Sequence, residues 1–211
     1  MKRISCGHSF LLGVDKPVGL SSHGAVARAR RALGESKVGH AGTLDPAASG
    51  VLLLGAGQAT RLLGTITLDD KRYLARIAFG SETATDDAEG DVVRTAPIGD
   101  ELFDEAFARA AVAALEGVCE QVPPAFSAVS IDGMRAYALA RKGGEVELAP
   151  RSITIHEASL ISIEACDGIV VWSCRFHVSK GTYIRSLARD LGRRLGSAAH
   201  LCSLARTASG T

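Results

Sequence analysis

Asp45 is a single carboxylate set in a tight turn, within the segment GTLDP at residues 42–46. Gly42 permits a positive φ or a close backbone approach, while Pro46 fixes its own φ and pushes Asp45 towards an extended conformation. The carboxylate is therefore held by the chain rather than left in solvent. Such a group is either the cap of an Asx-turn or a catalytic nucleophile, and the local sequence leaves both interpretations open.

Tyr183 and Arg185 form a second set of residues that could do chemistry. Apolar and polar side chains alternate over residues 170–178, which predicts a strand, and this strand runs into SKGTYIR at residues 179–185. A strand that delivers a tyrosine and an arginine to the start of a helix is typical of an active site. An arginine in this position is also commonly a surface charge, so this alternative stays open too.

Hydrophobic patterning predicts the elements that position these residues. Strands are expected over residues 10–14, 51–54, 71–79 and 170–178, and Tyr73 falls on the apolar face of the third. Helices are expected between a cap at Ser21 or Ser22 and Gly34, over residues 101–116 with Asp100 as the cap, and from Ile184 to a stop at Gly196.

Two further segments are expected to be irregular or to form a hairpin. The acidic stretch at residues 81–93 reads as a hairpin or loop, because its glycine is misplaced for a calcium-binding loop. Pro123 and Pro124 exclude a central strand or helix where they stand.

Length and composition restrict the class of protein. The chain has 211 residues, 46% hydrophobic residues and a net charge of +1, so it is an ordinary globular protein, either one large domain or two lobes sharing a sheet. A basic face for nucleic acid remains compatible with this net charge. The five cysteines are far apart and lack C-x-x-C, which predicts a reducing compartment without disulfides or a zinc site. Because no long apolar stretch occurs, we expect no membrane span and a cytoplasmic location.

Five motifs resemble those of one known family. The segment GHAGTLDPAASG at residues 39–50 resembles the signature of the TruB family of tRNA pseudouridine synthases. VDKPVGLSS at residues 14–22 resembles the family's first motif, with Ser21 in place of the usual threonine. QVPPAFSA at 121–128, SKGTYIRSLARDLG at 179–192 and AHLCSLART at 199–207 also match. The resemblance therefore runs over residues 15–207.

The resemblance implies a fold and a domain organisation. The expected class is α+β, with the mixed, largely antiparallel central sheet of pseudouridine synthases flanked by helices, in a single catalytic domain over residues 1–211. An RNA-gripping insertion is expected at about residues 121–152, where Ser130 replaces the lysine that the family usually carries. The family's small C-terminal RNA-binding extension is expected to be absent or truncated.

The resemblance also implies an activity, the isomerisation of a T-loop uridine of tRNA, at position 55, to pseudouridine. This reaction breaks the N1–C1′ bond, turns the base and rejoins it through C5, without redox change or a second substrate, so no cofactor and no metal are expected. Asp45 matches the catalytic aspartate, and Arg185 matches the arginine beside it. The other matching active-site positions are Tyr73, which stacks on the base, Tyr183, His40, which fills the space that the base vacates, and Leu204.

The expected partner is the T-stem-loop of tRNA, bound by a monomer through phosphate contacts. Seven basic residues are candidates for these contacts: Lys16, Arg28, Arg31, Arg141, Lys142, Lys180 and Arg189. The alternative function is a tRNA-binding chaperone without chemistry, in which Asp45 is only a turn residue. A serine hydrolase is excluded, because Ser49 lacks the G-x-S-x-G nucleophile elbow.

Overall fold

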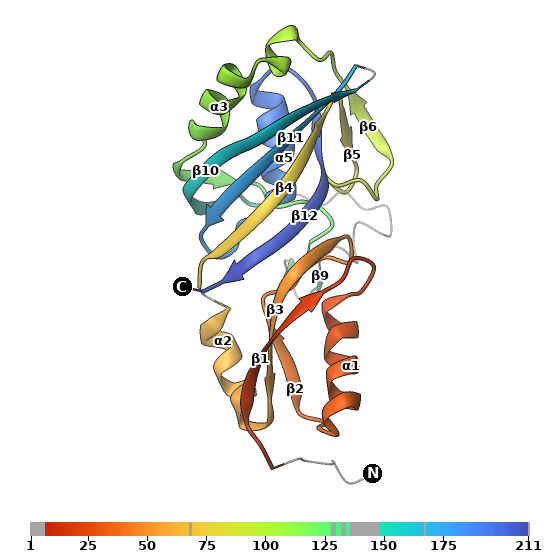
Figure 1. Cartoon of the computed structure of the whole chain (residues 1–211), viewed down its shortest axis with the longest axis vertical. Coiled ribbons are helices and arrows are strands. Elements are labelled where there is room, and N and C mark those ends of the chain that lie inside the picture. Colours follow the sequence, from red (N-terminus) through yellow and green to blue (C-terminus); the bar gives the residue numbers. More distant parts are fainter. Residues whose placement is uncertain are drawn as a thin grey trace. The chain divides into compact units, whose positions relative to one another are not determined.

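A computed structural model describes residues 7–67, 69–127, 130–131, 134–135, 148–166 and 168–210. Its contacts form two compact units (Figure 1), the first up to Leu74 together with the residues from Leu204, and the second over Ala75–Ser203. Strands β4, Lys71–Phe79, and β12, Ala199–Ser209, each run from one unit into the other. A single catalytic domain over residues 1–211 stays a prediction.

The first unit is built on strand β3, Ala48–Ala56. It pairs antiparallel with β1, Phe10–Lys16, and with β2, Val38–Ala41, and parallel with the end of β12. The side chains of Leu52 and Leu54 in β3 are almost fully buried. The strands predicted at residues 10–14 and 51–54 are therefore confirmed, and both are longer than predicted.

Helix α1, Ser22–Leu33, follows β1 and begins and ends at the predicted residues. The Ser21 hydroxyl accepts the first-turn N–H of Gly24, and Gly34 ends the helix in the left-handed conformation. The helix buries Ala25 and Val26 and contacts β2. After β3 come a 3-10 helix at Gly57–Leu62 and the short α2, Leu63–Ile66, which also contacts β2.

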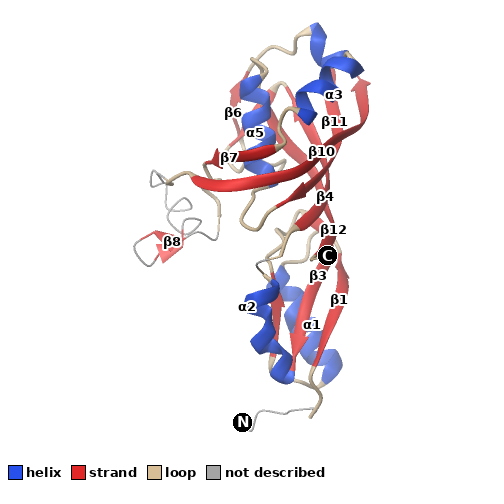
Figure 2. Cartoon of the chain, turned by 90° about the vertical axis from the view of Figure 1, so that its left-hand side faces the viewer, coloured by secondary structure: helices blue, strands red, loops and turns tan. Residues whose placement is uncertain are grey.

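The second unit holds a largely antiparallel sheet (Figure 2) in the order β12-β4-β11-β10-β7. Strand β10, Arg151–Cys166, pairs antiparallel with both β11, Ile169–Val178, and β7, Gly117–Gln121. The predicted alternation of β4 and β11 is confirmed, because Ile77 and Trp172 are fully buried. The Trp172 indole donates to the Leu102 carbonyl at 2.9 Å and packs on Phe79.

The helices of the second unit include one correction. The single helix predicted at residues 101–116 is wrong, because a 3-10 helix at Asp100–Phe103 ends before α3, Glu105–Ala113. Asp104 is extended there, and its carboxylate accepts the N–H of Phe107 at 2.6 Å, so Asp104 rather than Asp100 caps the α-helix. Helix α5, Ile184–Arg194, matches its prediction, with Gly196 at a φ of 72°.

The remaining segments lie between these elements. Strands β5, Ser81–Thr83, and β6, Val92–Thr95, form the predicted acidic hairpin. Pro123 and Pro124 lie in neither helix nor strand, as predicted, and the two-residue strands β8, Ser130–Ile131, and β9, Met134–Arg135, pair with each other. No helix in the described ranges is long and apolar enough to cross a membrane.

Candidate active site

Hydrogen bonds from the segment at residues 16–22 hold the turn of Asp45. The Leu44 N–H donates to the Ser22 hydroxyl at 2.8 Å, and this hydroxyl donates back to the Leu44 carbonyl at 2.9 Å. On the other side of Asp45, the Gly19 N–H donates to the Pro46 carbonyl at 2.8 Å. Asp45 itself is half-buried. Its position is therefore set from both sides by residues of an earlier motif.

Lys16 adds a buried positive charge to this anchor. Its side chain is 1% exposed, and its ammonium donates to the carbonyls of Leu20 at 2.7 Å and Ala48 at 2.5 Å. Burial lowers the pKa of the Lys16 ammonium, while the negative charge of Asp45 acts in the opposite direction. The charges of Lys16 and Asp45 therefore interact within the first unit. The prediction that Lys16 contacts phosphate finds no support in this burial.

Tyr73 and Arg206 form a buried polar pair in the first unit. Tyr73 in β4 is 8% exposed, and its phenol interacts with Arg206 in β12, which is 2% exposed. Burial raises the pKa of the Tyr73 phenol, the charge and hydrogen bond of Arg206 oppose this rise, and the charge of Asp45 adds to it. Arg206 is the one arginine in the segment AHLCSLART at residues 199–207, and no sequence pattern indicated a role for it.

The backbone around Asp45 needs its glycines. Gly42 has a φ of 75° and Gly50 a φ of 101°, which side-chain-bearing residues rarely adopt. A Cβ at Gly50 would also collide with the backbone of Arg206, the residue opposite it in the parallel ladder. The positive φ that Gly42 was expected to permit is confirmed, and Gly50 combines a positive φ with a close backbone approach.

His40 and Leu204 also belong to the first unit. His40 lies in β2 opposite Leu54, and its ring meets the ring of His23 edge-on, with centroids 5.4 Å apart. Burial lowers the pKa of His40, and the charges of His23 and Arg206 lower it further. This favours a neutral ring at neutral pH. Leu204 in β12 is half-buried and pairs with Ala48 in β3.

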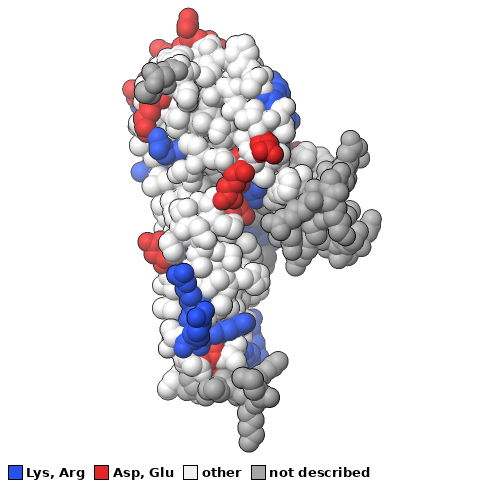
Figure 3. Space-filling view, turned by 90° about the vertical axis from the view of Figure 1, so that its right-hand side faces the viewer, with Lys and Arg blue, Asp and Glu red and all other residues white. Residues whose placement is uncertain are grey.

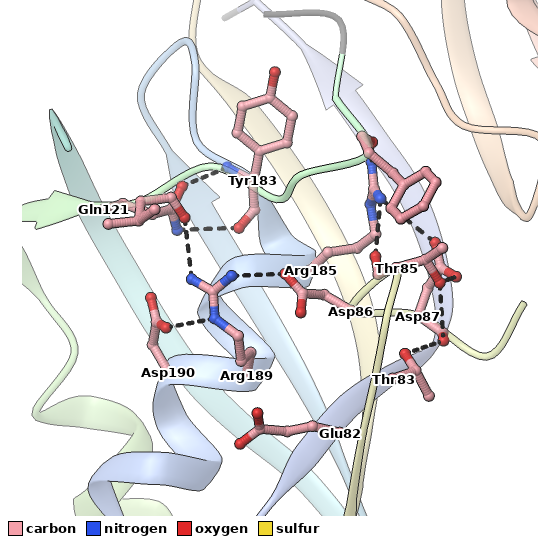
Figure 4. Close-up of polar contacts among 12 residues, drawn as sticks. Glu82, Thr83, Thr85, Asp86, Asp87, Gln121, Tyr183, Arg185, Arg189 and Asp190 are labelled. Atoms are coloured by element: carbon pink, nitrogen blue, oxygen red, sulfur yellow. Dashed lines mark hydrogen bonds and ion pairs between the residues drawn. The ribbon is translucent and has the colours of Figure 1, made fainter. Parts of the chain in front are cut away.

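In the second unit, the backbone of Tyr183 is fixed at the start of α5 (Figure 4). The side chain of Gln121 accepts the Tyr183 N–H at 2.8 Å and donates to the Tyr183 carbonyl at 3.0 Å. The guanidinium of Arg151 lies 6.0 Å from the centre of the tyrosine ring. The ring itself is half-buried, so Tyr183 combines a fixed backbone with a partly accessible side chain.

Arg185 is 5% exposed, which excludes the alternative of a simple surface charge. Its guanidinium donates to the carbonyls of Thr85 at 3.0 Å and Phe126 at 3.2 Å (Figure 4). It also lies 3.6 Å from the carboxylate of Asp87, a partner that sequence patterns did not predict. Asp45 belongs to the other unit, so its pairing with Arg185 stays a prediction.

Other arginines brace the acidic hairpin against α5. Arg189 bonds Asp86 at 2.8 Å and Asp190 at 2.9 Å, so its guanidinium is engaged within the second unit. Arg193 bonds the buried carboxylate of Glu82 at 2.6 Å. Burial raises the pKa of Asp86, and the charges of Arg189 and Arg185 only partly offset this. Ion pairs thus hold this hairpin in place.

The other basic candidates differ in exposure. Arg28 and Arg31 in α1 and Lys180 before α5 are exposed, and Figure 3 shows basic side chains on the side of the first unit that carries α1. Arg141 and Lys142 lie outside the described residues.

Across the described ranges, no three His, Cys, Asp or Glu side chains form a group that could hold a metal ion.

Comparison with known proteins identifies the family. Residues 30–184 match the model of the TruB family pseudouridylate synthase (N terminal domain). The chain belongs to the TruB family. It is 51% identical over 197 residues to tRNA pseudouridine synthase B of Mycobacterium sp. (strain KMS), covering 93% of this chain and 66% of the relative. The corresponding protein of Thermobifida fusca (strain YX) is 51% identical over 201 residues, with coverages of 93% and 68%. The chain thus spans about two thirds of the length of these TruB relatives.

Solved structures similar to this TruB-family chain confirm the predicted pseudouridine-synthase fold. A chain of a crystallised Cbf5-Nop10-Gar1 complex superimposes with a TM-score of 0.67 at 30% identity, covering 95% of this chain and 48% of that one. A chain of an H/ACA RNP bound to a substrate RNA containing 2'-deoxyuridine gives a TM-score of 0.64 at 28% identity, with coverages of 95% and 47%.

Proposed function

We propose that this protein isomerises a uridine in the T loop of tRNA, at position 55, to pseudouridine. Relatives that share half of its residues are named tRNA pseudouridine synthase B. The observation that carries the proposal is the anchored turn of Asp45, which is held by Ser22 and Gly19 and interacts electrostatically with Lys16 and Tyr73. A turn residue that only capped its loop would not need this surrounding.

The proposed reaction needs a carboxylate and little else. The N1–C1′ bond breaks, the base turns, a C5–C1′ bond forms, and a proton lost from C5 is balanced by one gained at N1. Asp45 is the nucleophile. It captures a carbon atom of the nucleoside or stabilises a cationic sugar, so that the detached base can still rejoin the sugar through C5. Attack at the sugar, attack at the base and an elimination route each use the same carboxylate.

Base recognition follows from the residues that accompany Asp45. A base inside a folded loop must turn outward, which costs a few kcal/mol. Tyr73 offers an aromatic face on which the base can stack, and a neutral His40 ring can take the place that the base leaves. Leu204 adds apolar surface for the base, and Tyr183 adds aromatic surface. Arg185 keeps Asp45 oriented through its planar guanidinium.

Binding of the T-stem-loop depends on exposed basic side chains. Arg28 and Arg31 lie three residues apart in α1, so they share one face of a helix that contains no acidic residue. Lys180 is exposed in the turn before α5. These cations can pair with phosphates of an RNA stem, which is recognised mainly through its shape and backbone.

The proposal includes an oligomeric state and a location. The protein acts as a monomer, and it acts in the cytoplasm, where its tRNA substrate is found.

A direct assay tests this proposal. The purified protein is incubated with a T-stem-loop RNA that carries tritium at C5 of its uridines, and pseudouridine is then mapped by carbodiimide modification and primer extension. We expect tritium release and one new pseudouridine at the T-loop position, and neither with an RNA that has cytidine there. Tight binding without pseudouridine would instead identify a chaperone.

A further inference from the structure

Arg206 joins three parts of the first unit that carry or adjoin the proposed chemistry. Its Nε donates to the Val51 carbonyl at 2.8 Å, and its Nη2 donates to the Gly42 carbonyl at 3.0 Å. Its side chain also interacts with the buried Tyr73 phenol. We infer that Arg206 is a positioning residue that locks the Asp45 turn and the Tyr73 hydroxyl into one arrangement. This inference rests on the proposed function.

The backbone of Arg206 is itself fixed. It pairs with Gly50 in the parallel ladder between β12 and β3, and a Cβ at Gly50 would collide with it. Gly42 also lies near Arg206, because a Cβ there would be 3.3 Å from Nη1 of its guanidinium. The side chain of Arg206 therefore extends from a fixed strand, and its guanidinium donates to the carbonyl of Gly42, at the start of the Asp45 turn.

The chemistry of the guanidinium decides what it does to Tyr73. Arginine is donor-only and stays protonated, so in the inferred hydrogen bond the Tyr73 oxygen is the acceptor. The phenol then keeps its own proton, which is available to a different acceptor. A buried tyrosine hydroxyl needs such a partner, and Arg206 supplies it without competing for the proton. Tyr73 can then donate towards the reacting base in a constant orientation.

Lysine cannot reproduce this arrangement. Its ammonium is a point charge, whereas the planar guanidinium presents five N–H donors in a rigid fork that reaches Val51, Gly42 and Tyr73 together. The contacts of Arg206 are internal to the protein, and it is 2% exposed. Losing them should therefore disturb the alignment of the reacting groups more than the binding of RNA.

A double-mutant cycle tests the positioning role. Single-turnover rates and RNA affinities are measured for Arg206→Lys, Tyr73→Phe and the double variant, with Arg61→Lys, an exposed arginine of the same unit, as the matched control. We expect Arg206→Lys to slow turnover by about tenfold or more with RNA affinity within about threefold, and to add little once Tyr73 is phenylalanine. Rate losses that multiply independently, or a loss of affinity at an unchanged rate, would overturn the inference.

A spectroscopic measurement tests the contact without relying on activity. Tyrosine labelled with 13C at Cζ gives signals for the three tyrosines of the chain, and Tyr73→Phe assigns one of them. Arg206→Met should shift the Tyr73 signal and leave the others in place. If Arg206→Met does not fold, the guanidinium N–H signals of Arg206, assigned with Arg206→Lys, are compared between wild type and Tyr73→Phe. An unchanged signal in either comparison would overturn the contact. Wild-type protein without activity would instead overturn the proposed function.

Discussion

The hydroxyl of Ser22 is hydrogen-bonded to both the N–H and the carbonyl of Leu44, the residue before Asp45. One side chain thus satisfies both backbone polar groups of a buried residue that lies outside any helix or strand. Ser22 is 2% exposed, so water cannot easily replace it. The motif at residues 14–22 therefore sets the position of the Asp45 turn, which lies in the motif at residues 39–50.

Replacing Ser22 with alanine should damage both stability and turnover. The variant leaves the Leu44 N–H and carbonyl without their partner, which should lower the free energy of unfolding by about 1–3 kcal/mol. Urea denaturation and single-turnover assays check this. The neighbouring Ser21→Ala is the matched control, because Ser21 only caps α1 and its loss should cost about 1 kcal/mol with turnover unchanged. Equal turnover in both variants would separate Ser22 from catalysis.

Asp45→Asn should abolish tritium release and retain RNA binding. The amide keeps the shape of the side chain but is not a nucleophile, so we expect a loss of rate of about a thousandfold or more. Asp15→Asn, an exposed acid of the same unit, serves as the control and should remain active. Turnover of Asp45→Asn near that of wild type would remove Asp45 as the nucleophile.

Arg185→Lys should impair turnover more than affinity. The guanidinium of Arg185 reaches Thr85, Phe126 and Asp87 together, and an ammonium cannot keep this fork geometry. We expect a fall in single-turnover rate of about tenfold or more and a change in RNA affinity within about threefold. Arg193→Lys in the same helix is the control, since Arg193 pairs with Glu82. An unchanged rate in Arg185→Lys would show that the fork is not needed.

The double variant Arg28→Ala and Arg31→Ala should weaken RNA binding and its dependence on salt. Each lost phosphate contact reduces the slope of log affinity against log salt concentration by roughly one, so the slope should become less steep by about two. Filter binding over a range of salt concentrations measures this. Arg109→Ala is the control, because Arg109 is exposed but pairs with Glu105 in α3. A slope equal to that of wild type would exclude phosphate contacts by α1.

Glu82 should make stability depend on pH in the acidic range. Burial alone raises the pKa of Glu82, but the hydrogen bonds and charges of Arg193 and Arg94 outweigh it and hold the pKa below its ordinary value. Such a carboxyl stabilises the fold above its unfolded pKa of about 4.3, and this stability is lost as pH falls through the lower folded pKa. The destabilisation caused by Glu82→Gln should therefore be larger at neutral pH than below pH ~3 in urea denaturation. Glu105→Gln, in an exposed ion pair, should show little such difference, and an identical difference at both pH values for Glu82→Gln would contradict the prediction.

Local patterns predicted most of the elements. The alternation in β4 and β11 and the caps Ser21 and Gly34 of α1 depend on residues close in sequence, so they could be recognised without a structure. The prediction of one helix over residues 101–116 was wrong because Asp100 and Asp104 compete as caps, and packing selects Asp104. The motifs also identified the family and the candidate Asp45. The twelve consecutive residues 39–50 carry more information than a short isolated motif.

The sequence by itself determined the family, the strand and helix pattern, and the presence of a held carboxylate at residue 45. Only the tertiary structure showed that Ser22, Lys16 and Arg206 surround that turn, because hydrogen bonds between residues 22 to 164 positions apart in sequence depend on how strands pair and what they bury. The sequence alone does not distinguish a buried lysine or arginine from an exposed one. Their burial at residues 16 and 206 follows from the packing of β1, β3 and β12, which no local pattern contains.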